Sequence, residues 1–127
     1  MLQSLVPPLH LPRARIEPIR TAGEALSVVS LAVSRPLREE LVVVTCDRRG
    51  AGHSLAVFDV HARPEALAHD VVGHASSSPF ATGVIAAHVR PTHDGLQHAL
   101  VDCLEKAGLA LLHFFTVHHG EVSAVGQ

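Results

Sequence analysis

Eleven histidines among 127 residues are the unusual feature of this sequence, and His88 is the one best placed for chemistry. It lies near the end of the apolar run 82–89, which Arg90 and Pro91 close, and a helical pattern begins directly after Asp94. In α/β proteins, functional groups commonly lie at the carboxyl end of a strand that faces the start of a helix. This stretch is therefore the predicted functional centre.

Hydrophobic periodicity and turn residues predict the elements that position this centre. A capping-box pattern at Thr21 opens the first helix, and Gly108 is placed to end the last one. The predicted segments are a helix at 22–34, strands at 37–46 and 54–60 that form a hairpin, a helix at 64–75, a strand at 82–89, a helix at 96–107, and strands at 109–117 and 121–125. This order predicts a three-layer α/β/α domain with a mixed sheet and helices on both faces.

The first twenty residues differ from the rest, because Pro7, Pro8, Pro12 and Pro18 lie among basic residues there. Residues 1–20 are predicted to be an extended, proline-rich arm that packs against the domain or a partner. Residues 21–127 form the single domain, which is long enough for a core of Val, Leu, Ile and Ala.

Composition excludes several classes of function. The ten basic and twelve acidic residues are well mixed and give a net charge of −2, so no basic stripe indicates a nucleic acid or a membrane surface. No signal peptide is expected, and no apolar run is long enough to span a membrane. Cys46 and Cys103 lie in apolar settings without metal-type spacing, as buried free thiols in a reducing cytoplasm would. No dinucleotide-binding glycine motif, P-loop or nucleophile elbow is present.

Three stretches of the chain are similar to the JAB/MPN (JAMM) domain, specifically to its RadC-like bacterial branch. They are 39–47 (EELVVVTCD), 84–91 (VIAAHVRP) and 111–123 (LLHFFTVHHGEVS). The second resembles the strand that ends in the family's His-x-His-Pro-Ser-Gly motif, and the third resembles its closing hairpin. The likeness covers residues 21–125 and implies the cytidine-deaminase-like architecture of that family.

The resemblance also implies a place for the family's chemistry. In members with the complete motif, two histidines and a later aspartate hold zinc, and a glutamate activates the zinc-bound water for attack on an amide or isopeptide carbonyl. Glu39, or its neighbour Glu40, takes the place of the catalytic acid. His88 takes the place of the first histidine.

Arg90 takes the place of the second histidine. In a strand, residues 88 and 90 project from the same face, so Arg90 is expected to point towards the place where His88 would hold a metal. A guanidinium stays protonated, offers no lone pair and repels a divalent cation. The aspartate has no single counterpart because the loop is shorter than in the family, so Asp94 is the first candidate and His93 the next. No cofactor is the main expectation, and zinc bound by His88, His93 and Asp94 is the alternative.

The same residues also have roles that need no metal. Arg90 could pair with Glu39 or Asp94 in a polar cluster, or it could anchor a small anionic ligand. Asp94 and Gln97 have the spacing of a capping box for the helix that follows.

A non-catalytic, strongly diverged RadC-like JAB/MPN domain is the function that these patterns favour, as an interaction or structural module in the cytoplasm. The apolar arm and composition favour a homo-oligomer, such as a dimer, or a protein partner. His98 is expected on a helix surface, and His118 and His119 are expected to be solvated in a turn. The chain is not expected to be an enzyme. If it is one, it would be a zinc hydrolase of the JAMM type with Glu39 as the base.

Overall fold

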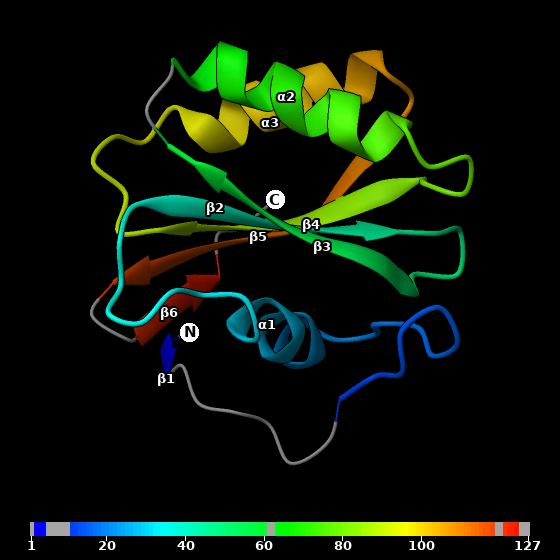
Figure 1. Ribbon diagram of the computed structural model, residues 1–127, viewed down its shortest axis with the longest axis horizontal. Helices are drawn as coiled ribbons and strands as arrows, with labels where there is room; N and C mark the ends of the chain where they lie inside the picture. Colours follow the sequence, from blue (N-terminus) through cyan, green and yellow to red (C-terminus); the bar gives the residue numbers. More distant parts are fainter. Residues whose placement is uncertain (1, 5–10, 61–62, 119–120, 125–127) are drawn as a thin grey trace.

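Within the part of the chain that the structure describes, three helices and a six-stranded sheet form the three layers that the sequence predicted. The computed structural model describes residues 2–4, 11–60, 63–118 and 121–124. Helices α2 and α3 cover one face of the sheet and α1 covers the other (Figure 1). Among the described residues, no helix is long and apolar enough to cross a membrane. The elements are β1 (Leu2–Ser4), α1 (Ala22–Ser30), β2 (Glu40–Cys46), β3 (Gly52–Asp59), α2 (Pro64–Ser76), β4 (Gly83–Val89), α3 (Leu96–Lys106), β5 (Ala110–His118) and β6 (Glu121–Ala124).

The sheet is mixed, with the strand order β1-β6-β5-β4-β2-β3. β2 is antiparallel to both β3 and β4, and β5 is antiparallel to β6. β4 and β5 are parallel, which requires a crossover connection that α3 supplies. The carboxyl ends of β4 and β5 therefore lie at the same edge of the sheet.

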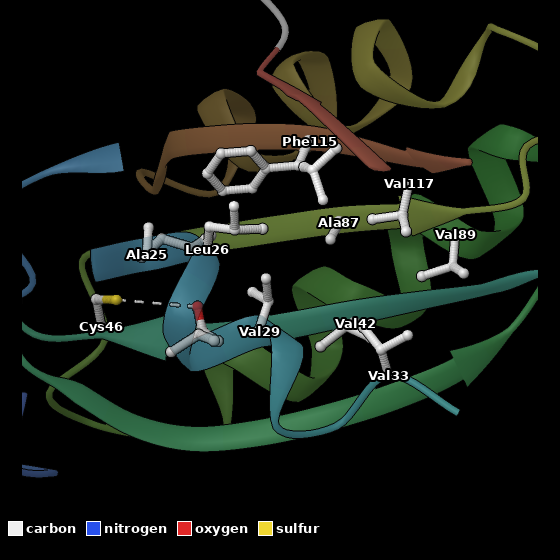
Figure 2. Close-up of a cluster of buried hydrophobic side chains, with 13 residues drawn as sticks. Ala25, Leu26, Val29, Val33, Val42, Cys46, Ala87, Val89, Phe115 and Val117 are labelled. Atoms are coloured by element: carbon white, nitrogen blue, oxygen red, sulfur yellow. Dashed lines mark hydrogen bonds between the residues drawn. The ribbon is translucent and has the colours of Figure 1, made fainter. Parts of the chain in front are cut away.

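Two apolar cores lie on the two sides of this sheet. Strands β2 and β4 are buried along their whole length, as expected for central strands that are covered on both faces. Figure 2 shows the core on the α1 side, where Ala25, Leu26 and Val29 face side chains of the strands. The core on the other side joins α2 and α3 to the sheet through residues such as Leu41, Leu67 and Leu100.

The N-terminal arm contributes more structure than the sequence pattern predicted. Its strand β1 pairs with β6 and extends the sheet at one end. Residues 13–19 pack against the β2–β3 turn, where the backbone N–H groups of Arg15 and Ile19 donate to the carbonyl oxygens of Gly52 and Gly50. Residues 5–10 lie outside the described part.

Helix termini were predicted with mixed success. Thr21 caps α1 by accepting from the backbone N–H of Glu24, and Gly108 has the positive φ of +78° expected of a helix-ending glycine. However, α1 ends at Ser30 rather than at 34, because the chain turns to place the Ser34 amide on the Glu40 carboxylate. The capping box of Asp94 and Gln97 is wrong: the N-cap of α3 is Gly95, with no side-chain cap hydrogen bond.

Two glycines give a matched test of this backbone. Gly73 lies within α2 and Gly108 has the left-handed conformation, and an added Cβ would meet no atom within 4 Å at either site. Gly73→Ala should therefore stabilise the fold by roughly 0.5–1 kcal/mol, because glycine is a poor helix former. Gly108→Ala should destabilise it by about 1 kcal/mol, because alanine resists a positive φ. Urea denaturation measures both, and changes of the same sign would contradict the assignment.

Candidate functional site

A cavity of about 610 Å³ lies at the carboxyl ends of β4 and β5, beside the first turn of α3. His88 enters it from β4 and His118 from β5, and the loop between β4 and α3 supplies His93 and Asp94. The prediction that His88, His93 and Asp94 lie around one site is therefore consistent with their positions. The described residues that line the cavity are His88, Pro91, Thr92, His93, Asp94, Leu96, Gln97, Phe114, Thr116 and His118.

The structure separates the two candidate glutamates, because neighbouring residues of a strand face opposite sides of a sheet. Glu39, which directly precedes β2, is not among the described residues that line the cavity, but its Oε2 is 3.1 Å from Nε2 of the cavity residue His88. Thr92 donates to the same carboxylate from its backbone N–H (3.2 Å) and from its hydroxyl (3.0 and 3.1 Å). Glu39 is thus the acid that lies beside His88.

Glu40 belongs to the opposite layer and is fully buried under α1. The Ser34 amide and hydroxyl donate to its carboxylate at 2.8 and 2.7 Å, and Arg38 Nε donates at 3.0 Å. These bonds satisfy a buried charge that would otherwise be costly. The alternative of Glu40 as the site's acid is therefore wrong.

Burial and hydrogen bonding set the protonation state of the His88–Glu39 pair. His88 is 2 % exposed, and burial lowers its pKa despite the opposing pull of the Glu39 carboxylate. Burial alone would raise the pKa of Glu39, but the hydrogen bonds from His88 and Thr92 outweigh it and hold that pKa below the ordinary value. At neutral pH, a neutral His88 therefore donates its Nε2–H to an ionised Glu39.

Arg90 does not lie where the sequence placed it. β4 ends at Val89, and Arg90 has a φ of +48°, so its side chain leaves the strand direction. Its backbone N–H donates to Val117 O at 2.8 Å, and Nη1 donates to the carbonyl oxygen of Leu37 at 3.1 Å. It is not among the described residues that line the cavity, and within that part of the chain it pairs with neither Glu39 nor Asp94. The predicted ion pair is therefore wrong.

The three residues predicted to hold zinc lie around the cavity, but His88 is engaged by Glu39 in this arrangement. The Nε2 atom of His88 is hydrogen-bonded to Glu39, and the rings of His88 and His93 have centroids 5.6 Å apart. Within the described ranges, no group of three or more His, Cys, Asp or Glu side chains has the arrangement of a metal site. A structural or catalytic zinc requires at least three such protein ligands.

The sequence reasoning did not assign Thr116 or His118 to the cavity. His118 was expected to be solvated in a turn, and it is exposed, but at the end of strand β5. The register pairs His88 with Thr116, so these side chains share a face, and His118 lies two residues further along β5. The parallel β4–α3–β5 unit was the available signal, because it aligns the ends of both strands. His113 faces the other layer and stacks on Phe115, and His119 lies outside the described residues. His98 is exposed on α3, as predicted.

Neither cysteine is among the described residues that line the cavity. Both are free thiols, as predicted, and Cys46 is fully buried. Burial raises the pKa of its thiol to about 12, with a smaller contribution from the charge of Asp47, so the reactive thiolate does not form near neutral pH. Cys103 is only partly buried, on α3.

The lowered pKa of His88 predicts a loss of stability in mild acid. An unfolded histidine titrates near pH 6.5, above folded His88, so the unfolded state binds more protons as the pH falls through this window. The free energy of unfolding should fall between about pH 7.5 and about pH 5.5, and less steeply in His88→Gln, which can still donate to Glu39. His98→Gln, on the exposed face of α3, is the control. Equal slopes in wild type and His88→Gln would refute this account.

The positive φ of Arg90 predicts an inverted preference between two small residues. Arg90→Gly and Arg90→Ala both lose the bond to Leu37, but only glycine tolerates this backbone without strain. Arg90→Gly should be the more stable variant by about 1 kcal/mol, measured by urea denaturation. An alanine variant as stable as the glycine variant would show that the turn is unstrained.

Comparison with known proteins adds no family to this description. No protein-family model matches the chain, and no curated protein matches it. The mixed α/β, three-layer architecture is confirmed by the structure, and the resemblance to the JAB/MPN domain stays a prediction.

Proposed function

We propose that this chain is a RadC-like JAB/MPN-type domain that acts as a non-catalytic interaction or structural module. One observation carries the proposal: Glu39 and His88 are hydrogen-bonded to each other. A JAMM hydrolase would need the acid for its water and the histidine for its metal. Here Glu39 and His88 are hydrogen-bonded to each other, and Thr92 donates further hydrogen bonds to the Glu39 carboxylate.

The position of Arg90 supports the same proposal. Arg90 takes the place of the second histidine, and its guanidinium donates a hydrogen bond to the carbonyl oxygen of Leu37. A guanidinium does not bind a metal, and Arg90 is not among the described residues that line the cavity, which counts against its use as an anion anchor. The geometry therefore favours neither the hydrolase alternative nor the anion-binding one.

The cavity retains features that suit the binding of a partner's segment. Leu96, Phe114 and Pro91 supply apolar surface, while His93 and His118 supply polar groups around it. The volume of the cavity is within the range of ligand-binding pockets, and we propose that a side chain or short peptide stretch of a partner fills it. We place the domain in the cytoplasm, with a protein partner or a second copy, because its two free thiols suit a reducing compartment.

Metal analysis tests the proposal most directly. Purified, untagged protein should contain no zinc in stoichiometric amount, and its melting temperature should be the same with zinc added and with chelator. Zinc at a hundred times its dissociation constant would raise the free energy of unfolding by about 2.7 kcal/mol, which is readily measured. Elemental analysis and thermal unfolding provide the two readouts.

His88→Ala and His98→Ala form the matched pair for this experiment, since one histidine lines the cavity and the other is exposed on α3. One zinc per chain that is lost in His88→Ala, but kept in His98→Ala, would reject the non-catalytic proposal. That result would favour the altered hydrolase with His88, His93 and Asp94 as ligands.

A further inference from the structure

Strand β3 is the last strand at one end of the sheet, and most of its outer edge is unpaired in the described chain. The N-terminal segment pairs with the start of this edge, and further along its residues 11–14 line a cavity of about 180 Å³ beside Ser54 and Leu55. At the start of the edge, Arg15 donates to Gly52 O at 2.9 Å, and Pro18 forms an isolated bridge with Ala51. From His53 to Asp59, no described backbone group pairs with the outer side of β3. A row of N–H and C=O groups is therefore available there.

The sequence of β3 lacks the usual features that keep a sheet edge from pairing. Residues 54–58 read SLAVF, with no charge and no proline. Leu55 and Val57 lie opposite Val44 and Val42 of β2, so they face the α1 side, where they are 40 % and 42 % exposed. Natural edge strands are commonly protected by charged residues, proline or a covering element. The composition of β3 is therefore that of an edge strand that can pair with a strand of another chain.

We propose that β3 pairs antiparallel with β3 of a second copy, about a two-fold axis that passes through Ala56. Such an axis keeps every side chain on its own face, so opposing residues must both be odd-numbered or both even-numbered. An axis at Leu55 would set Val57 against His53, and an axis at Val57 would set Leu55 against Asp59. Of these three axes, only the one at Ala56 sets Leu55 against Val57.

This register makes the edge complementary to itself in both polarity and charge. The apolar pair lies side by side at the centre, and the Asp59 carboxylate, 65 % exposed, lies near the end of the second strand that carries His53. His53 already binds Asp47 at 2.7 Å, and Asp59 lies 3.5 Å from Arg38, so both groups keep their partners within the chain. A symmetric dimer requires an edge that is complementary to itself, whereas the binding of an unrelated peptide does not. The self-complementary edge therefore identifies the occupant as a second copy of the chain. The inference does not depend on the proposed function of the cavity.

Two matched lysine variants test the surface. The full chain should have twice its 13.5 kDa mass by sedimentation at micromolar concentration. Val57→Lys should be monomeric at concentrations where Val101→Lys is still dimeric. Val101 lies on α3 and is 41 % exposed, so the two substitutions are equally exposed. A monomeric wild type, or a Val57→Lys protein that is folded by circular dichroism and still dimeric, would overturn the proposal.

Cysteine cross-linking tests the register and does not depend on how Val57→Lys folds. Leu55→Cys and Val57→Cys proteins should form an intermolecular disulfide when mixed and oxidised, since directly opposed Cα atoms lie about 4.5–5.5 Å apart. Each variant alone should form much less, because like residues are offset by about 7 Å along the strand. Wild type under the same oxidation controls for Cys46 and Cys103. Cross-linking of a single variant that equals the mixture, or no cross-link in the mixture, would reject this register.

Discussion

The parallel pairing of β4 and β5 is the constraint on which the rest of the site depends. Two parallel neighbours must be joined by a crossover, and α3 provides it with its first turn against the end of β4. The same pairing brings His88 and His118, which are far apart in the sequence, to one cavity. An antiparallel arrangement of these two strands would have put their carboxyl ends at opposite edges of the sheet.

Most of the fold could be predicted because each element carries a strong local signal. The apolar run in β2 marks a strand buried on both faces, and the spacing of Leu96, Leu100 and Leu104 marks the inner face of α3. The end of α1 was placed too late because its cause is tertiary: Ser34 leaves the helix to reach the carboxylate of Glu40. β1 was not predicted because a strand of three residues is too short to show a hydrophobic periodicity.

The location of the site was predictable, but its connections were not. A strand-end histidine before a helix drew attention to the residues around His88, and these residues do line the cavity. Choosing between Glu39 and Glu40 required the register of β2, since a shift of one residue reverses the face of every side chain. Arg90 was misplaced because its φ of +48° is a local backbone property that its residue type disfavours. The place of His118 at the cavity was not predicted, because the spacing of residues does not show which strands are neighbours in the sheet.

Glu39 and Glu40 are consecutive residues, and their carboxylates are bonded to opposite layers of the molecule. One is held by His88 and Thr92 at the cavity, and the other is held by Ser34 and Arg38 beneath α1. The backbone between the two residues is therefore tied to both faces of the sheet, and a movement of this peptide unit would strain hydrogen bonds on both sides. His88, which lines the cavity, is thus positioned through Glu39 by a backbone that the Glu40 carboxylate anchors from the opposite layer.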